Sequence, residues 1–199
     1  MNCDFIAPHY WWIERLGMGH ALERRRLWFL PEIGSARRAL VLGDGNGRFL
    51  SAFVRRNPAV RAHYVDLSKG MLELAQETAG TERVTYENAD ARTIQLPPGE
   101  YDLIATHFFF DCFAESELEV LIGRIAKAAK PGARWVVSEF RDASFGARLV
   151  VRFLYLFFRI TTGLKTRTLV DHRPILQSHG FRLTNAHQSR LVVSELWER

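Results

Sequence analysis

Short runs with the character of β-strands recur along the chain, and each is bounded by glycine, proline or polar residues. They cover residues 39–42, 62–66, 84–88, 101–106 and 134–140. Between them, apolar residues recur every three or four positions, most clearly over residues 49–54 and 118–129, which predicts amphipathic helices. Apolar strands that alternate with helices are typical of a parallel sheet covered on both faces. The pattern therefore predicts an α/β fold.

The two flanks of this alternating region have their own patterns. Residues 5–33 are rich in aromatic side chains, and the spacing of their apolar positions predicts helices. In residues 145–165, one face of a predicted helix carries Arg148, Arg152, Tyr155 and Arg159, and the other residues are mostly apolar. Residues 171–179 predict a short helix that Gly180 ends. Residues 181–188 and 191–197 then predict a closing hairpin.

Gly43, Gly45 and Gly47 follow the first predicted strand and precede a helix. A helix that begins there directs unpaired backbone N–H groups and the positive end of its dipole toward a ligand. Glycine permits the positive φ of such a turn and a close approach of the ligand. No Lys-Ser or Lys-Thr follows, which excludes a P-loop, and Arg48 stands where the dinucleotide fingerprint has its third glycine. The loop predicts a site for a nucleotide-like ligand.

Acidic residues end the next two predicted strands. Asp66 lies 23 residues after Gly43, near the offset of roughly 20 residues at which an acid binds ribose. Its carboxylate can accept hydrogen bonds from both ribose hydroxyls. Asp90 follows the third strand, and Ser68 is placed to cap the helix after Asp66.

Composition sets limits on the function. The chain has 199 residues, a net charge of +5 and 47% hydrophobic residues, which is ordinary for one globular domain. Its arginines are spread along the sequence, so we expect no nucleic-acid partner. Cys3 and Cys112 have no metal-ligand spacing, and no leader peptide is evident; these features favour a cytoplasmic protein without a metal.

Four segments together resemble the class I, Rossmann-like methyltransferases that depend on S-adenosylmethionine (SAM). These are Gly43-x-Gly45-x-Gly47, the D-x-S-x-x-M-L-x-x-A run from Asp66 to Ala75, the fourth strand at 101–106, and the turn at 130–132. Within the family, the chain is most similar to the small-molecule enzymes of quinone biosynthesis. It departs from the family at Val41, where an acid is usual, and Asp44 is the nearest substitute.

This resemblance implies a seven-stranded, mostly parallel sheet with an antiparallel last strand and helices on both faces. It implies a single methyltransferase domain over residues 1–199. Within that domain, we expect a helical N-terminal lid at 1–35, a SAM-binding core at 36–140, a helical substrate cover at 145–180 and the closing hairpin at 181–199.

The resemblance also implies a cofactor and its contacts. The cofactor is expected to be SAM, with S-adenosylhomocysteine as the product. Asp66 would bind the ribose, and Asp90 would accept a hydrogen bond from the adenine amino group. The full expected set is Gly43, Asp44, Gly45, Gly47, Asp66, Leu67, Met71, Ala89, Asp90, Ala91, Thr106 and His107.

The fourth strand ends in His107, and the aromatic residues 108–113 follow it. Aromatic side chains at this edge favour a small apolar or aromatic acceptor. His107 is a candidate general base because its ordinary pKa is about 6.5, and Asp111 is a candidate to orient its ring. Tyr10 and His9 of the expected lid are alternative catalytic residues. A pure packing role for His107 is equally compatible with the sequence.

Other functions remain open from the sequence alone. An NAD(P)-dependent oxidoreductase shares the glycine loop and Asp66 but does not explain Asp90. A SAM-binding protein that no longer catalyses would be compatible with Val41. The stripe of Arg148, Arg152 and Arg159 fits an active-site cover, a membrane-surface helix or a homodimer face, and the apolar run is too short to span a bilayer.

Overall fold

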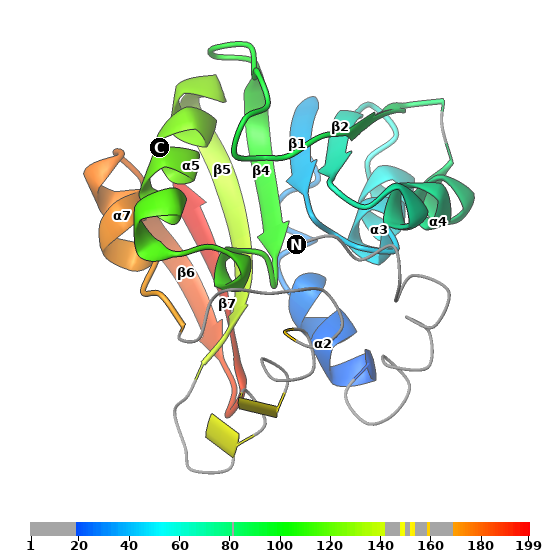
Figure 1. Ribbon diagram of the computed structural model, residues 1–199. Coiled ribbons are helices and arrows are strands. Elements are labelled where there is room, and N and C mark those ends of the chain that lie inside the picture. The colour runs from blue at the N-terminus through cyan, green and yellow to red at the C-terminus, as the bar shows by residue number, and fades with distance from the viewer. Residues whose placement is uncertain (1–18, 81, 142–147, 150–151, 154–158, 160–168) are drawn as a thin grey trace.

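A computed structural model describes residues 19–80, 82–141, 148–149, 152–153, 159 and 169–199 of the chain. Its centre is a seven-stranded sheet with the strand order β3-β2-β1-β4-β5-β7-β6 (Figure 1). The strands are β1 (Arg38–Leu42), β2 (Arg61–Asp66), β3 (Val84–Asn88), β4 (Tyr101–His107), β5 (Ala129–Phe140), β6 (Arg182–Gln188) and β7 (Val192–Glu198). The helices are α2 (Gly19–Arg26), α3 (Arg48–Arg56), α4 (Lys69–Ala79), η2 (Phe110–Cys112), α5 (Glu115–Ala128) and α7 (Arg173–Ser178).

Strand directions agree with the sequence prediction. β1 pairs in parallel with β2 and β4, β2 pairs in parallel with β3, and β4 pairs in parallel with β5. Only β7, the last strand in the sequence, is antiparallel to its neighbours β5 and β6. The predicted closing hairpin is therefore confirmed. In this order β1 and β4 are adjacent at the centre, and the chain runs outward from them on both sides.

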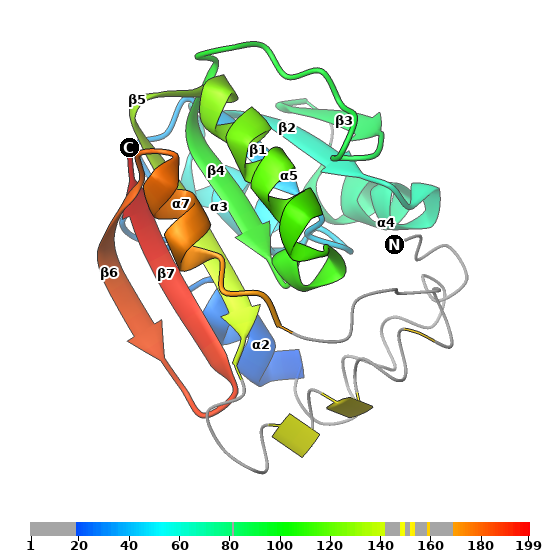
Figure 2. The same ribbon diagram turned by 60° about the vertical axis from the view of Figure 1, so that its left-hand side comes forward.

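Two helical layers bury the two faces of the sheet. The helices α5 and α7 lie over one face (Figure 2), and their apolar side chains join Trp135, Val137 and Trp197 in one core. On the other face, α3, α4 and the segment after α2 bury a second core with Val41, Leu103 and Val136. The central strands β1, β4 and β5 therefore contribute alternate residues to the two cores, which explains their largely apolar sequences.

The ends of α4 and α7 follow local chemistry. Ser68 caps α4, because its side chain accepts a hydrogen bond from the Met71 N–H, as predicted. Gly180 follows α7 with a φ of 86°, a left-handed conformation that ends the helix. Both helices are thereby fixed relative to the strand ends beside them.

Two segments expected to cover the site fall mainly outside the described residues. The N-terminal lid prediction covers residues 1–35, of which 1–18 are not described, and Tyr10 and His9 are among these. In the expected cover at 145–180, Leu149 and Phe153 are exposed. Among the described residues, no helix is long and apolar enough to cross a membrane.

Candidate active site

The glycine loop connects the end of β1 to the start of α3. Gly43, Gly45 and Gly47 have φ angles of 63°, 64° and 74°, a region that side chains other than glycine rarely adopt. A Cβ added at Gly43 would lie 2.5 Å from Cδ2 of Phe109, and one at Gly47 would lie 2.8 Å from Cβ of Ala75. Glycine is therefore required for both the backbone conformation and the space. The turn offers a side-chain-free cradle that fits a nucleotide-like cofactor.

Asp44 lies inside this loop and is almost fully buried. Its Oδ2 accepts a hydrogen bond of 3.0 Å from the Leu50 N–H, in the first turn of α3. Burial raises the pKa of Asp44 to about 6, although Arg26 nearby opposes the shift. Within the described part of the chain, Oδ1 is buried without a hydrogen-bond partner. The side chain thus holds the loop against α3, and its expected contact with the cofactor stays a prediction.

Asp66 ends β2 next to the glycine loop. The Ser68 N–H donates a hydrogen bond of 2.9 Å to its Oδ1. The Tyr64 hydroxyl lies 2.7 Å from the Gly45 carbonyl oxygen and 3.2 Å from Asp66 Oδ2, so it links the loop to the carboxylate. The Asn88 amide donates to the carbonyl of Asp66 and ties β3 to this point. The ribose-binding candidate is therefore held in a fixed position beside the loop.

We expect Asp66→Ala to weaken SAM binding by about 1.5–3 kcal/mol, the usual range for hydrogen bonds to a charged group. Titration calorimetry with SAM measures this loss directly. Glu87→Ala is a suitable control, because Glu87 lies on β3 and bonds His63 instead of the loop. Equal SAM affinity in Asp66→Ala and the wild type would contradict the ribose assignment.

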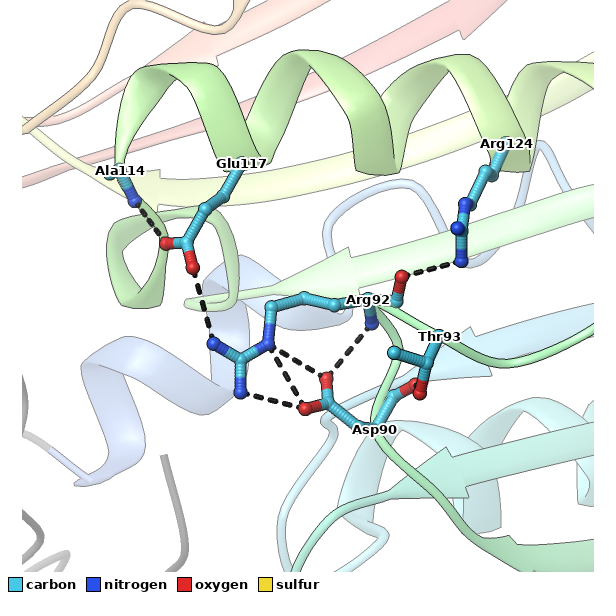
Figure 3. Close-up of polar contacts among 6 residues, drawn as sticks. All are labelled: Asp90, Arg92, Thr93, Ala114, Glu117 and Arg124. Atoms are coloured by element: carbon cyan, nitrogen blue, oxygen red, sulfur yellow. Dashed lines mark hydrogen bonds and ion pairs between the residues drawn. The ribbon is translucent and has the colours of Figure 1, made fainter.

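Asp90 lies just after β3 and forms an extended ion pair with Arg92 (Figure 3). The Arg92 side chain donates to both carboxylate oxygens at 2.7–3.0 Å, and its backbone N–H also binds Oδ1. Arg92 reaches Glu117 of α5 as well, at 3.2 Å. These hydrogen bonds lower the pKa of Asp90. The carboxylate expected to bind adenine thus already has strong donors, and adenine would have to compete with Arg92.

Substitutions of Asp90 and Arg92 distinguish two roles for Asp90, a contact with adenine and an ion pair with Arg92. If Asp90 contacts adenine, Asp90→Ala should weaken SAM binding more than tenfold. Arg92→Ala should change it less than fivefold, because a half-exposed ion pair is worth at most about 1 kcal/mol. Calorimetry on the two variants provides the comparison. An equal loss in both would mean that Asp90 serves only as the partner of Arg92.

The other expected cofactor residues gather at the same edge. Leu67 follows β2, and its carbonyl accepts from the Asn88 amide at 2.9 Å. Met71 is buried in the first turn of α4. Ala89 and Ala91 flank Asp90, and the Ala89 N–H donates to the Asp66 carbonyl. Thr106 is fully buried near the end of β4, and its hydroxyl accepts from the Trp135 indole at 2.9 Å.

His107 ends β4 but faces away from Asp111. Its buried ring packs on Phe49 of α3 at 4.5 Å between ring centroids. Neither ring nitrogen has a hydrogen-bond partner among the described residues. Burial, together with the Arg26 charge, lowers the pKa of His107 well below its ordinary value.

The prediction that Asp111 orients the His107 ring is therefore wrong. Phe108 has a left-handed backbone with a φ of 54°, and η2 then carries Phe110 against Trp135 on the face that α5 covers. Because His107 belongs to the opposite face, the two side chains diverge. A catalytic role for either residue stays a prediction.

A cavity of about 310 Å³ opens beside η2 at the carboxyl end of β5. Sequence reasoning expected an acceptor site at the aromatic residues 108–113 but did not include Glu139 in it. The residues that line the cavity are Phe110, Asp111, Glu139, Phe140, Arg141, Leu169, Val170, Asp171, His172, Arg173, Gln188 and Val193. Glu139 could have been found from the sequence, because it is a carboxylate at the end of a predicted strand, as Asp66 is.

Phe109 connects this cavity to the glycine loop. Its ring fills the space beside Gly43. Its N–H donates a hydrogen bond of 3.0 Å to Glu139 Oε1, and the Phe110 N–H donates to the same oxygen at 2.9 Å. One short segment therefore touches the loop expected to hold the cofactor and the carboxylate on the cavity wall.

Glu195 of β7 organises the cavity on its other side. It is fully buried and accepts hydrogen bonds from His172 Nε2 at 2.8 Å, Arg173 Nε at 2.7 Å and the Trp197 indole at 3.0 Å. Burial alone would raise its pKa, but these donors lower it below the ordinary value. The network fixes the start of α7 against β7. Sequence reasoning missed it because its members lie in separate elements.

Comparison with known proteins identifies the same family as the motifs. Residues 39–132 match a family described as a methyltransferase domain. The chain is 33% identical over 147 residues to a demethylmenaquinone methyltransferase of Thermus thermophilus, which covers 71% of the chain and 66% of that relative. A protein of the same name from Deinococcus radiodurans is 29% identical over 162 residues, covering 78% and 66%. The aligned part of the chain thus spans about two thirds of the length of these relatives.

Solved structures share the fold. A SAM-dependent methyltransferase of Mesorhizobium loti superposes with a TM-score of 0.72 at 21% identity, covering 92% of this chain and all of that one. The N-methyltransferase NodS of Bradyrhizobium japonicum gives a TM-score of 0.69 at 14% identity, covering 94% and 98%. These two structures show the fold. The family itself follows from the matched methyltransferase domain and the Thermus thermophilus relative. The chain belongs to the class I, Rossmann-like family of SAM-dependent methyltransferases.

Proposed function

We propose that this protein transfers the methyl group of SAM to a small, largely apolar acceptor bound in the 310 Å³ cavity beside η2. The connection through Phe109 carries the proposal, because its ring packs against Gly43 of the loop and its N–H binds Glu139 on the cavity wall. Phe110, Phe140, Val170 and Val193 form the apolar part of the cavity wall, against which an aromatic ring could pack. The relatives named demethylmenaquinone methyltransferases support an acceptor of that kind.

The residues have distinct roles in this proposal. The glycine turn, Asp66 and Asp90 would hold the cofactor, and bound SAM would supply an electrophilic methyl group on a sulfonium. The chain's main task is then to align the acceptor atom with that methyl group. Alignment of this kind can supply about 7–11 kcal/mol of the barrier. The cavity and the loop meet at one sheet edge, which is the arrangement that such an alignment requires.

Methyl transfer from isotopically labelled SAM tests this function. The acceptors are a panel of hydroxyl-bearing aromatic compounds that includes a reduced naphthoquinone. We expect label in the extracted acceptor and release of one S-adenosylhomocysteine for each methyl group transferred. A protein that binds SAM but labels none of these acceptors would contradict the proposal and favour a SAM-binding protein without catalysis.

A further inference from the structure

The two carboxylate oxygens of Glu139 differ in their hydrogen bonding. The side chain is 4% exposed, and its Oε1 accepts both backbone hydrogen bonds from Phe109 and Phe110. Within the described residues, Oε2 is buried and has no hydrogen-bond partner. A buried polar atom without a partner is costly, so native proteins rarely retain one without a reason. Because Glu139 lines the cavity, a ligand there is the natural partner for Oε2.

A second carboxyl group lies close by. Asp111 also lines the cavity, and its negative charge adds to the effect of burial in raising the pKa of Glu139 well above its ordinary value. Burial raises the pKa of Asp111 to about 6. In its ionised form each carboxylate is thus a stronger base than an exposed acid, and a ligand that donates a proton would reduce the repulsion between the two charges.

The charges around the cavity restrict that ligand. Three acidic groups, Asp111, Glu139 and Asp171, share its wall with two guanidinium groups, Arg141 and Arg173. Arg173 is paired with Glu195, whereas Arg141 bonds the neutral amide of Gln188 at 2.6 Å. A cationic ligand would be repelled by the positive charge of Arg141. A neutral group with a dissociable proton on an aromatic body suits both these charges and the apolar walls.

We propose that Glu139 Oε2, with Asp111 beside it, binds the hydroxyl group of a phenol-type acceptor and receives its proton during methyl transfer. The proposal rests on the function proposed above and names its substrate class. The hydroxyl proton passes to Oε2, the acceptor forms one new bond to the methyl carbon, and the electron pair of the broken carbon–sulfur bond stays on sulfur. Glu139 is then a catalytic residue that touches the acceptor.

Binding of two probes tests the hydrogen bond without relying on activity. The probes are 1-naphthol, which can donate a proton, and 1-methoxynaphthalene, which cannot. We expect the wild type to bind 1-naphthol at least tenfold more tightly. In Glu139→Gln the amide oxygen can still accept from Phe109 and Phe110, but an NH₂ group replaces Oε2. The preference should then fall below threefold. An unchanged preference in this variant would overturn the proposal.

Two further variants show whether the effect depends on the position of the Glu139 carboxylate or only on net charge. Glu139→Asp keeps the negative charge, but its side chain is shorter by one methylene group. This variant should also lose the preference for 1-naphthol. Glu119→Gln removes one exposed negative charge from α5 and should behave as the wild type. If Glu119→Gln lost the preference as fully as Glu139→Gln, net charge would be the cause and the proposal would fail.

Methyl transfer then separates this proposal from the function on which it rests. For a hydroxyl acceptor that is turned over, Glu139→Gln should lower kcat by roughly 100-fold while SAM affinity stays within twofold. Normal turnover in Glu139→Gln would overturn the role of Glu139 and leave the function intact. A wild type that prefers 1-naphthol but transfers no methyl group would overturn the function and the proton transfer, and leave the carboxyl site as a binding site.

Discussion

Replacing Gly43 by alanine is expected to weaken SAM binding by more than tenfold and to destabilise the fold. The residue has a φ of 63°, and its new Cβ would lie 2.5 Å from the Phe109 ring. Left-handed strain and overpacking each cost about 1–3 kcal/mol. The ring has little room to move, because the Phe109 backbone is bound to Glu139 and the ring itself packs on Phe113. Calorimetry with SAM and chemical denaturation measure the two effects.

Gly99→Ala is the matched control for this change. Gly99 has a φ of 61°, almost the same as Gly43, but a Cβ there would meet nothing within 4 Å. It should show the backbone strain alone, with a loss of about 1–3 kcal/mol in the free energy of unfolding and unchanged SAM affinity. If Gly43→Ala bound SAM as tightly as Gly99→Ala, the glycine loop would not be the cofactor cradle.

Replacing Glu195 by alanine should have the largest effect on stability. The change leaves His172 and the Trp197 indole buried without their acceptor and removes the partner of Arg173. Breaking a buried charge network of this kind costs about 3–5 kcal/mol. For a chain of this size, that corresponds to a fall in melting temperature of roughly 6–20 °C. Thermal unfolding followed by circular dichroism measures it.

The control for Glu195 lies on the same strand. Glu198 is only partly buried at the end of β7, and Glu198→Ala should change the free energy of unfolding by no more than about 0.5 kcal/mol. A similar small change in Glu195→Ala would show that the network contributes little to stability. Its role would then be limited to shaping the cavity.

The strands of the sheet were predictable because short, continuous stretches of sequence encode them. The central parallel strands contain short apolar runs next to turn signals, and the Gly43–Gly47 loop and Ser68 encode their own backbone conformations. The placement of Asp66 at the sheet edge followed from the same logic, because the carboxyl ends of parallel strands lie together. The family resemblance supplied the number of strands and the antiparallel direction of the last one.

The cavity was not predictable in this way, because it depends on how distant segments meet. Phe108 adopts a left-handed backbone without being glycine, so nothing local indicated that Asp111 would turn away from His107. Glu195 meets His172 only through the register of β7 and the start of α7. The partnership of Glu139 with the Phe109 N–H likewise links two strand ends 30 residues apart.

Titration calorimetry of the wild-type protein with SAM and with NAD tests the central claim most directly. We propose that the glycine turn, Asp66 and Asp90 form a site for SAM, so we expect one molecule of SAM to bind per chain and S-adenosylhomocysteine to compete with it. NAD should give no measurable heat of binding at the same concentrations. Tight binding of NAD together with no binding of SAM would contradict the account.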